Sequence, residues 1–241
     1  MTEAVKIVRQ ERRLRTEATM LEAFETVLVR EGAGNVTVQA VADEAGVAKT
    51  LLYRYFDDIG GLIKAWGKQR DLFVPLDELF PDPEASARAL YDDPFQFAKN
   101  QILKQAQHMR NHPAYIELCL AELSGSGPVI DALMELRLER NEAESAALGV
   151  TTLDGSTVPM LLPLLLLPAA ITYLAMRARK SPVYAGGIQL DTDQGWARIM
   201  VAVEQSIDLI AMAAKMAELT KADQQQLAEQ FLQRRDPSQT G

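Results

Sequence analysis

Cysteine, histidine and aromatic residues are all scarce in this chain of 241 residues. Cys119 is the only cysteine, which rules out an internal disulfide and favours a reducing compartment. A glycine-rich phosphate loop is also missing, because the Gly-Ser-Gly run at 125–127 lacks the Lys-Ser/Thr pair that follows such a loop. The sequence therefore predicts a protein that is not an enzyme and that uses no cofactor and no metal.

Long alternations of β-branched residues are absent, although 48% of the residues are hydrophobic. No apolar pattern repeats every two residues, as a strand in a sheet would require, and the apolar residues recur instead at helical spacing. The length suits a small domain followed by a larger one with a substantial core. The predicted fold class is all-α.

A net positive charge is missing as well, since the formal net charge is −8. The acidic excess lies in residues 56–241, whereas residues 1–55 carry eight basic and eight acidic side chains. Ahead of the predicted first helix, residues 1–15 form a basic arm that is well placed for phosphate or minor-groove contact. This arm has no apolar segment, so we expect no signal peptide and a cytoplasmic protein. Its basic residues are Lys6, Arg9, Arg12, Arg13 and Arg15.

The run at 36–56 predicts a helix-turn-helix. Thr37 can cap a short first helix, because its hydroxyl can accept a free backbone N–H of the first turn. Gly46 follows that helix, where glycine tolerates a positive φ. A second helix at 48–56 turns Leu52 inward and keeps its outer and leading faces polar. Such a helix, presented across a tight turn, fits the major groove of DNA, and an ordinary helical hairpin is the alternative.

Residues from Arg9 to about Trp66 resemble the N-terminal domain of the TetR family of transcriptional regulators. The resemblance rests on a long first helix, on the hairpin above and on the closing run LLYRYFDDIGGLIKAW. It implies a dimeric, all-helical regulator, usually a repressor, whose affinity for DNA falls when a small molecule binds the larger domain. The family pattern is filled here by Leu52, Tyr53, Tyr55, Phe56 and Leu62.

The resemblance makes residues 1–66 a helix-turn-helix DNA-binding domain and residues 67–241 an effector-binding and dimerisation domain. Ile59 stands where the family usually has a phosphate-binding lysine, and Leu51 stands where a small hydroxyl residue is common; the basic arm can compensate. The residues predicted to bind DNA are Thr37, Gln39, Lys49, Thr50, Tyr53, Arg54, Tyr55 and Arg13. Of these, Gln39, Lys49 and Thr50 are placed for base edges, and Tyr53 and Arg54 mainly for the backbone.

The larger domain contains several sequence signals for the start of a helix. Asp93 is a predicted N-cap with Pro94 at the first helical position, and Asp191 or Thr192 would cap a later helix. Amphipathic periodicity supports the helices that follow. The predicted helices span 94–110, 114–123, 129–148 and 196–219, with a loop at 149–158, a short polar helix from Thr220 and a loose tail at 236–241.

The run at 158–176 has no charged residue and is long enough to span a bilayer. Pro163 and Pro168 would kink or break such a helix, and a span would place the basic residues at 177–180 against the positive-inside bias. We expect instead a helix that is buried by the core on one face and by a second subunit on another. The predicted homodimer forms through helices at about 158–180 and 192–219, and it reads an approximately palindromic DNA operator. A membrane-tethered helical protein is the alternative.

A cavity between helices of the larger domain is expected to bind a small effector that is neutral or cationic and mostly apolar. His108 and His112 have a spacing that suits a metal, but Pro113 follows at once and no third ligand is near, so pocket-lining or surface histidines are favoured. The residues predicted to line the cavity are Phe97, His108, Met109, Tyr115, Cys119, Met134 and Tyr173, with ordinary core packing as the alternative for each.

A helix at about 59–73 is predicted to connect the two domains. Movement of this helix would change the spacing of the two recognition helices in the dimer, so that an effector lowers operator affinity by its differential binding. An activator or a ligand-independent regulator of the same fold remains an alternative, because the sign of regulation depends on where the operator sits. An enzyme that uses His108 and His112 is a further one.

Overall fold

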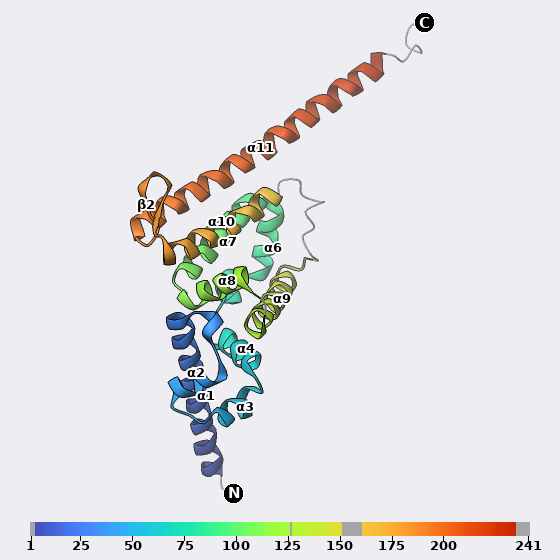
Figure 1. Ribbon diagram of the computed structural model, residues 1–241. Helices are drawn as coiled ribbons and strands as arrows, with labels where there is room; N and C mark the ends of the chain where they lie inside the picture. The colour runs from blue at the N-terminus through green and yellow to red at the C-terminus, as the bar shows by residue number, and fades with distance from the viewer. Residues whose placement is uncertain (1–2, 126, 151–160, 235–241) are drawn as a thin grey trace.

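The structure is a computed structural model that describes residues 3–125, 127–150 and 161–234. Its long elements are all helices, which confirms the predicted all-α class. The N-terminal helix lies at one end of an elongated molecule and the C-terminal helix projects from the other (Figure 1). Three predicted features fall wholly or largely outside the described residues: the beginning of the apolar run at 158–160, the loop at 149–158 and the tail at 236–241.

The N-terminal part consists of α1 (Glu3–Glu31), a 3-10 turn (Ala33–Asn35), α2 (Val38–Ala45), α3 (Lys49–Phe56) and α4 (Ile59–Gln69). The basic residues that we predicted as an arm ahead of the first helix belong to α1, so that prediction is wrong. The physical reason is that residues 3–31 contain neither glycine nor proline and are rich in good helix formers, so nothing in the sequence starts the helix later.

The helix-turn-helix forms as its local signals predict. The Thr37 hydroxyl accepts the backbone N–H of Ala40 at 3.1 Å, which caps α2. Gly46 follows α2 with a φ of 64°, the left-handed conformation that favours glycine. Leu52 and Phe56 are buried on the inner face of α3. Both helices are therefore set by residues that the sequence identifies.

α4 is shorter than predicted, because it ends at Gln69 and not near Phe73. Asp71, with a φ of 46°, turns the chain after the last helical residue. The N–H of Leu72 then donates to the carbonyl of Gly67, and the Leu72 side chain becomes almost completely buried. Burial of this leucine explains the early end of the helix.

The larger part contains α5 (Leu76–Leu79), α6 (Pro83–Asp92), α7 (Pro94–Arg110), α8 (Pro113–Ser124), α9 (Pro128–Leu148), α10 (Leu161–Lys180) and α11 (Asp193–Arg234). α7, α8 and α9 confirm three predicted helices to within one residue at each end. Asp93 caps α7 by accepting the N–H of Gln96 at 3.0 Å, as predicted. α10 continues through Pro168, so the expectation that this proline would break the helix is wrong. Its only local effect is that proline has no backbone N–H to donate within the helix.

A small β-hairpin between α10 and α11 was not predicted. β1 (Val183–Tyr184) pairs with antiparallel β2 (Ile188–Gln189), and two glycines with positive φ make the turn. Strands of two residues are too short to show an alternating pattern. Thr192 caps α11, as expected, by accepting the N–H of Gly195 at 3.0 Å.

The predicted break of the last helix at Thr220 is wrong, because α11 continues to Arg234. The Thr220 hydroxyl donates to the Met216 carbonyl within the helix, so it caps nothing, and residues 221–234 contain no glycine or proline. Over the residues that the structure describes, no helix combines the length and the apolar character that a membrane crossing requires.

One hydrophobic core joins the N-terminal part to the larger part. Phe24 and Trp66 are fully buried in it, and it extends to Leu118 of α8 and Leu133 of α9. Gly67 of α4 lies so close to α9 that a carbon added there would be 2.7 Å from the nearest Leu136 methyl group. A second cluster is formed by α7, α8, α10 and the first half of α11. α4 is thus packed firmly on the larger domain.

Candidate nucleic-acid interface

The leading and outer surface of α3 is polar and open to solvent. Lys49, Thr50, Tyr53 and Arg54 are all exposed, as a helix that enters the major groove requires. The Lys49 ammonium lies 6.0 Å from the centroid of the Tyr53 ring, so these two predicted contact residues are neighbours. Gln39 on α2 is exposed too, and its amide donates to Asp43 at 2.7 Å.

A groove between α1 and α3, which we call the arginine groove, lies beside this surface. Its volume is about 810 Å³, and four of its eight lining residues are arginines while none is acidic. Guanidinium groups bind phosphate through several N–H donors at once, so an acid-free arginine cluster suits a nucleic-acid backbone. The lining residues are Arg9, Gln10, Arg12, Arg13, Thr16, Leu51, Arg54 and Tyr55.

The arginine groove contains two arginines that we did not include among the predicted contact residues. The sequence identified Arg9 and Arg12 only as members of the basic arm. They lie with Thr16 at helical spacing, and this periodicity in α1 is the signal that places them on one face. Tyr55, which we expected on the outer surface, is half-buried and packs against the core and Arg13. Ile59, at the position where the family usually has a lysine, also packs partly against the core.

A smaller cavity lies in the larger domain, and we call it the apolar cavity. Its volume is about 140 Å³, and it is lined by the segment after α4 together with α7, α8, α9 and α10. The lining residues are Leu72, Phe73, Val74, Ile102, Gln105, Ala106, His108, Met109, Tyr115, Arg140, Pro168, Ile171 and Thr172.

The structure places three of the seven predicted cavity residues at the apolar cavity: His108, Met109 and Tyr115. Phe97 instead stacks on Phe80 at 6.3 Å in a separate cluster, and Cys119 is buried beside α9. Met134 and Tyr173 are each 50% exposed and are not among the lining residues. Arg140 and Thr172 were not predicted, because only the packing of α9 and α10 brings them to this space.

A polar cluster connects α8 with α9 next to the apolar cavity. One Nη of Arg137 donates to both carboxylate oxygens of Glu122, at 2.6 and 2.7 Å. The other Nη faces the Tyr115 hydroxyl at 3.5 Å and the Cys119 sulfur at 3.6 Å. Burial raises the pKa of Tyr115 to about 12 and also raises the pKa of the Cys119 thiol. Cys119 therefore stays protonated at neutral pH and is a poor nucleophile.

The two histidines contact the chain just beyond α4. Nε2 of His108 donates to the Asp71 carbonyl at 2.7 Å, and Nε2 of His112 donates to the Arg70 carbonyl at 2.9 Å. Both rings thus hold the residues just after α4, His108 from the end of α7 and His112 from the start of α8. Within the described ranges, no three His, Cys, Asp or Glu side chains are placed to hold a metal ion.

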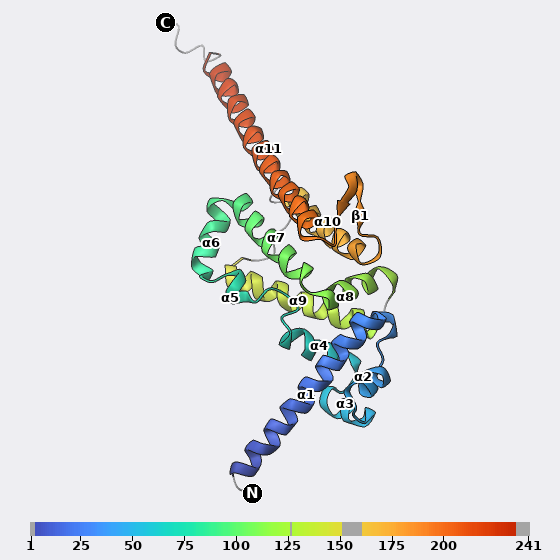
Figure 2. The same ribbon diagram turned by 90° about the vertical axis from the view of Figure 1, so that its left-hand side faces the viewer.

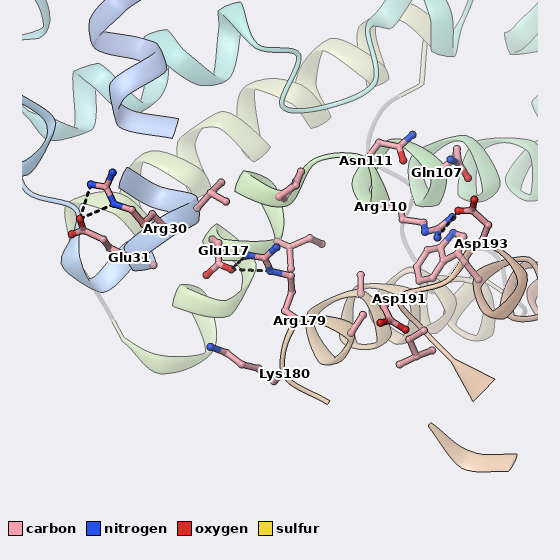
Figure 3. Close-up of a pocket in the computed structure, with 18 residues that line it drawn as sticks. Arg30, Glu31, Gln107, Arg110, Asn111, Glu117, Arg179, Lys180, Asp191 and Asp193 are labelled. Carbon is pink, nitrogen blue, oxygen red and sulfur yellow. Dashed lines mark hydrogen bonds and ion pairs between the residues drawn. The ribbon is translucent and has the colours of Figure 1, made fainter. Parts of the chain in front are cut away.

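A second groove, of about 750 Å³, lies between the end of α1 and the beginning of α11, and it is lined by charges of both signs. Figure 3 shows Glu117 and Arg179 facing each other across its middle, at 2.8 Å. Arg110 and Asp193 pair at 2.8 Å at one end. Because these charges neutralise one another, this groove lacks the single sign that marks the arginine groove.

Comparisons with known proteins agree with this geometry. Residues 20–66 match the family model described as bacterial regulatory proteins, tetR family, which confirms the resemblance for the helix-turn-helix part of the chain. No curated protein matches the chain.

The fold is similar to solved structures of TetR regulators. A TetR family regulator from Marinobacter aquaeolei VT8 is 20% identical, with a TM-score of 0.50, over 83% of this chain and 97% of that one. NalD, the secondary repressor of the MexAB-OprM multidrug efflux pump in Pseudomonas aeruginosa, is 16% identical, with a TM-score of 0.50, over 81% and 97%. Identities this low show a shared fold that extends through the larger domain.

Proposed function

We propose that this chain, whose residues 20–66 match the tetR family of bacterial regulatory proteins, is a dimeric repressor that a small effector releases from its operator. The observation that carries the proposal is the arginine groove beside the exposed face of α3. The groove would hold phosphates and fix the register, while Lys49 and Thr50 would contact base edges in the major groove. This is a binding function, exerted in the cytoplasm where bacterial DNA lies.

The dimer is inferred from an uncovered apolar surface on α10 and α11. α11 extends away from the rest of the molecule in both views, and no described side chain after Ile207 is buried (Figures 1 and 2). Apolar surface of this extent is what obligate dimers bury. The exposed apolar residues of the two helices are Leu165, Leu166, Tyr173, Val201, Leu209, Met212 and Met216.

Release by an effector is inferred from the contacts of α4. Its C-terminal end is held by His108 and His112, while its inner face packs on α9 and its N-terminal end follows α3 directly. A molecule in the apolar cavity touches the segment that follows α4. A bound state in which this segment moves would change how far apart the two α3 helices lie in the dimer, and operator affinity would fall by the differential binding energy.

Selection from a pool of random DNA duplexes, with the purified full chain, tests the proposal. The expected product is a two-fold symmetric site with half-sites about one helical turn apart, bound by a dimer. Binding of the selected site, measured by fluorescence anisotropy, should weaken steeply with salt because phosphate contacts release counterions. Recovery of no symmetric site, or binding by a monomer, would contradict the dimeric mechanism. Transcription in vitro from a promoter that overlaps the site separates a repressor from an activator.

A further inference from the structure

The apolar cavity is small enough to limit what can bind in it. Its volume is about 140 Å³, and an apolar cavity of about 150 Å³ is known to accept a benzene ring. Eight of its thirteen lining residues have aliphatic, proline, phenylalanine or methionine side chains. This volume suits a compact molecule with one ring or a short branched chain.

The polar residues that line the cavity include basic side chains but no acidic ones. Arg140 and His108 are basic, Gln105, Tyr115 and Thr172 are neutral, and none of the lining residues is acidic. An ammonium group here would find no acidic side chain among the lining residues, whereas a carboxylate would meet the guanidinium of Arg140. The side chain of Arg140 is only 13% exposed, so solvent screens such an interaction weakly.

Arg140 is held in place through its Nε. Its Nε donates to Glu144, one turn along α9, at 2.5 Å. A guanidinium has five N–H donors, and in the described part of the chain no partner is found for the four on its two terminal nitrogens. Those two nitrogens form the edge that binds a carboxylate with two parallel hydrogen bonds.

We propose that the apolar cavity binds a compact, mostly apolar molecule with a single carboxylate, which pairs with the terminal nitrogens of Arg140. The sequence-based expectation of a neutral or cationic effector came from the net charge of the whole domain. The lining of the cavity points the other way. Glu144 balances the charge of Arg140, but the terminal nitrogens of Arg140 offer the donors that a carboxylate needs, and no lining residue offers a carboxylate to a cation.

A molecule bound in the cavity would affect the DNA-binding domain through His108. This side chain lines the cavity, and its Nε2 holds the Asp71 carbonyl at 2.7 Å. Leu72, Phe73 and Val74 also line the cavity and directly follow that carbonyl. A ring in the cavity therefore presses on the segment that ends α4. This regulatory part of the inference rests on the proposed function.

Isothermal titration of the full chain with benzoate, benzyl alcohol and benzylamine tests the ligand class, because the three probes share a ring and differ in charge. We expect benzoate to bind at least about tenfold more tightly than either of the others, because a hydrogen bond to a charged group is the stronger kind. Equal or tighter binding of benzylamine, or no binding of benzoate, would overturn the proposal.

Two variants locate the site. Arg140→Met should weaken benzoate binding at least about tenfold and leave benzyl alcohol unchanged, while Arg140→Lys should restore part of the loss. Arg88→Met is the matched control, because Arg88 pairs with Glu84 at the same spacing on exposed α6. If Arg140→Met does not fold, Ala106→Leu, which fills the cavity, should abolish benzoate binding. Unchanged binding in a folded Arg140→Met or Ala106→Leu protein refutes the site.

Binding of selected DNA with and without saturating benzoate separates the two proposals. A chain that binds DNA but not benzoate refutes the cavity assignment and leaves the regulator intact. A chain that binds benzoate but enriches no DNA site refutes the regulator and leaves the cavity assignment intact.

Discussion

The guanidinium of Arg13 lies 5.5 Å from the centroid of the Tyr55 ring, and this contact joins the N-terminal half of α1 to the recognition helix α3. It lies in the arginine groove, next to Arg54. Because the contact crosses between the two helices, phosphate binding by α1 and base reading by α3 share one rigid surface. Their contributions to DNA binding can nevertheless be separated by substitution.

Arg13→Ala should weaken binding to all DNA sequences alike and reduce the slope of log affinity against log salt by about 1, the value for one phosphate contact. Lys49→Ala should instead relax base preference at one position in each half-site, at a cost of about 1–3 kcal/mol for the matched base. Anisotropy with matched and scrambled duplexes measures both effects, with Arg88→Ala as a control outside the groove. Identical behaviour of the Arg13 and Lys49 variants would refute this division.

Gly61→Ala should destabilise the DNA-binding domain by about 3 kcal/mol, the upper end of the cost of overpacking. A Cβ at Gly61 would lie 1.9 Å from the carbonyl oxygen of Phe56, which is backbone and cannot turn aside. Urea unfolding followed by circular dichroism measures the change. Gly34→Ala is the control, because a Cβ there meets nothing within 4 Å. Equal stability of the two variants would show that the turn before α4 is more adaptable than this contact implies.

Leu209→Glu should convert the dimer into a monomer. Leu209 is 64% exposed on α11, on the surface that we assign to the second subunit, and a buried unpaired carboxylate is strongly unfavourable there. Leu138→Glu is the matched control, because Leu138 is similarly exposed, at 59%, on α9. Sedimentation velocity gives the oligomeric state of both. If the dimer persists in Leu209→Glu but is lost in Leu138→Glu, the interface lies on α9 and not on α11.

Stability should fall with rising pH between about pH 10 and pH 12 because of Tyr115, whose pKa burial raises to about 12 in the folded chain. The protonated phenol is favoured by folding, so its contribution is complete below the unfolded pKa and is lost as the pH rises through the folded one. The loss is on the order of 3 kcal/mol. Urea unfolding of the wild type and Tyr115→Phe measures it, since the variant should lose less stability over this range. Parallel curves would show that Tyr115 ionises without penalty.

Local signals in the sequence were enough to predict α2, α3, α7, α8 and α9 with their ends, whereas α5 and α6 were not predicted. Thr37, Gly46, Asp93 and Thr192 act through neighbours within a few residues, and each behaves in the structure as its residue type implies. Predictions failed where a distant contact decides the outcome. α4 ends early because Leu72 is buried against the larger domain, which no property of residues 59–73 reveals.

The candidate sites divide in the same way. Exposed residues of α3 follow from helical spacing, so Lys49 and Thr50 lie where the sequence places them. The apolar cavity is formed by five separate segments, and Arg140 reaches it only through the packing of α9 against α4, α6 and α8. Size and polarizability identified Met134 and Tyr173 as candidates, but those properties do not specify which face of a helix is covered.

The core that joins α1 and α4 to α8 and α9 has a consequence for cooperativity. Phe24, Trp66, Leu118 and Leu133 lie in one cluster of buried side chains, so the helix-turn-helix cannot unfold without exposing part of the larger domain. Calorimetry should then show these two parts melting in a single transition, with a calorimetric enthalpy that matches the van't Hoff value. A fragment that ends at Trp66 would present its half of this core to water, and we expect it to aggregate or to remain only partly folded.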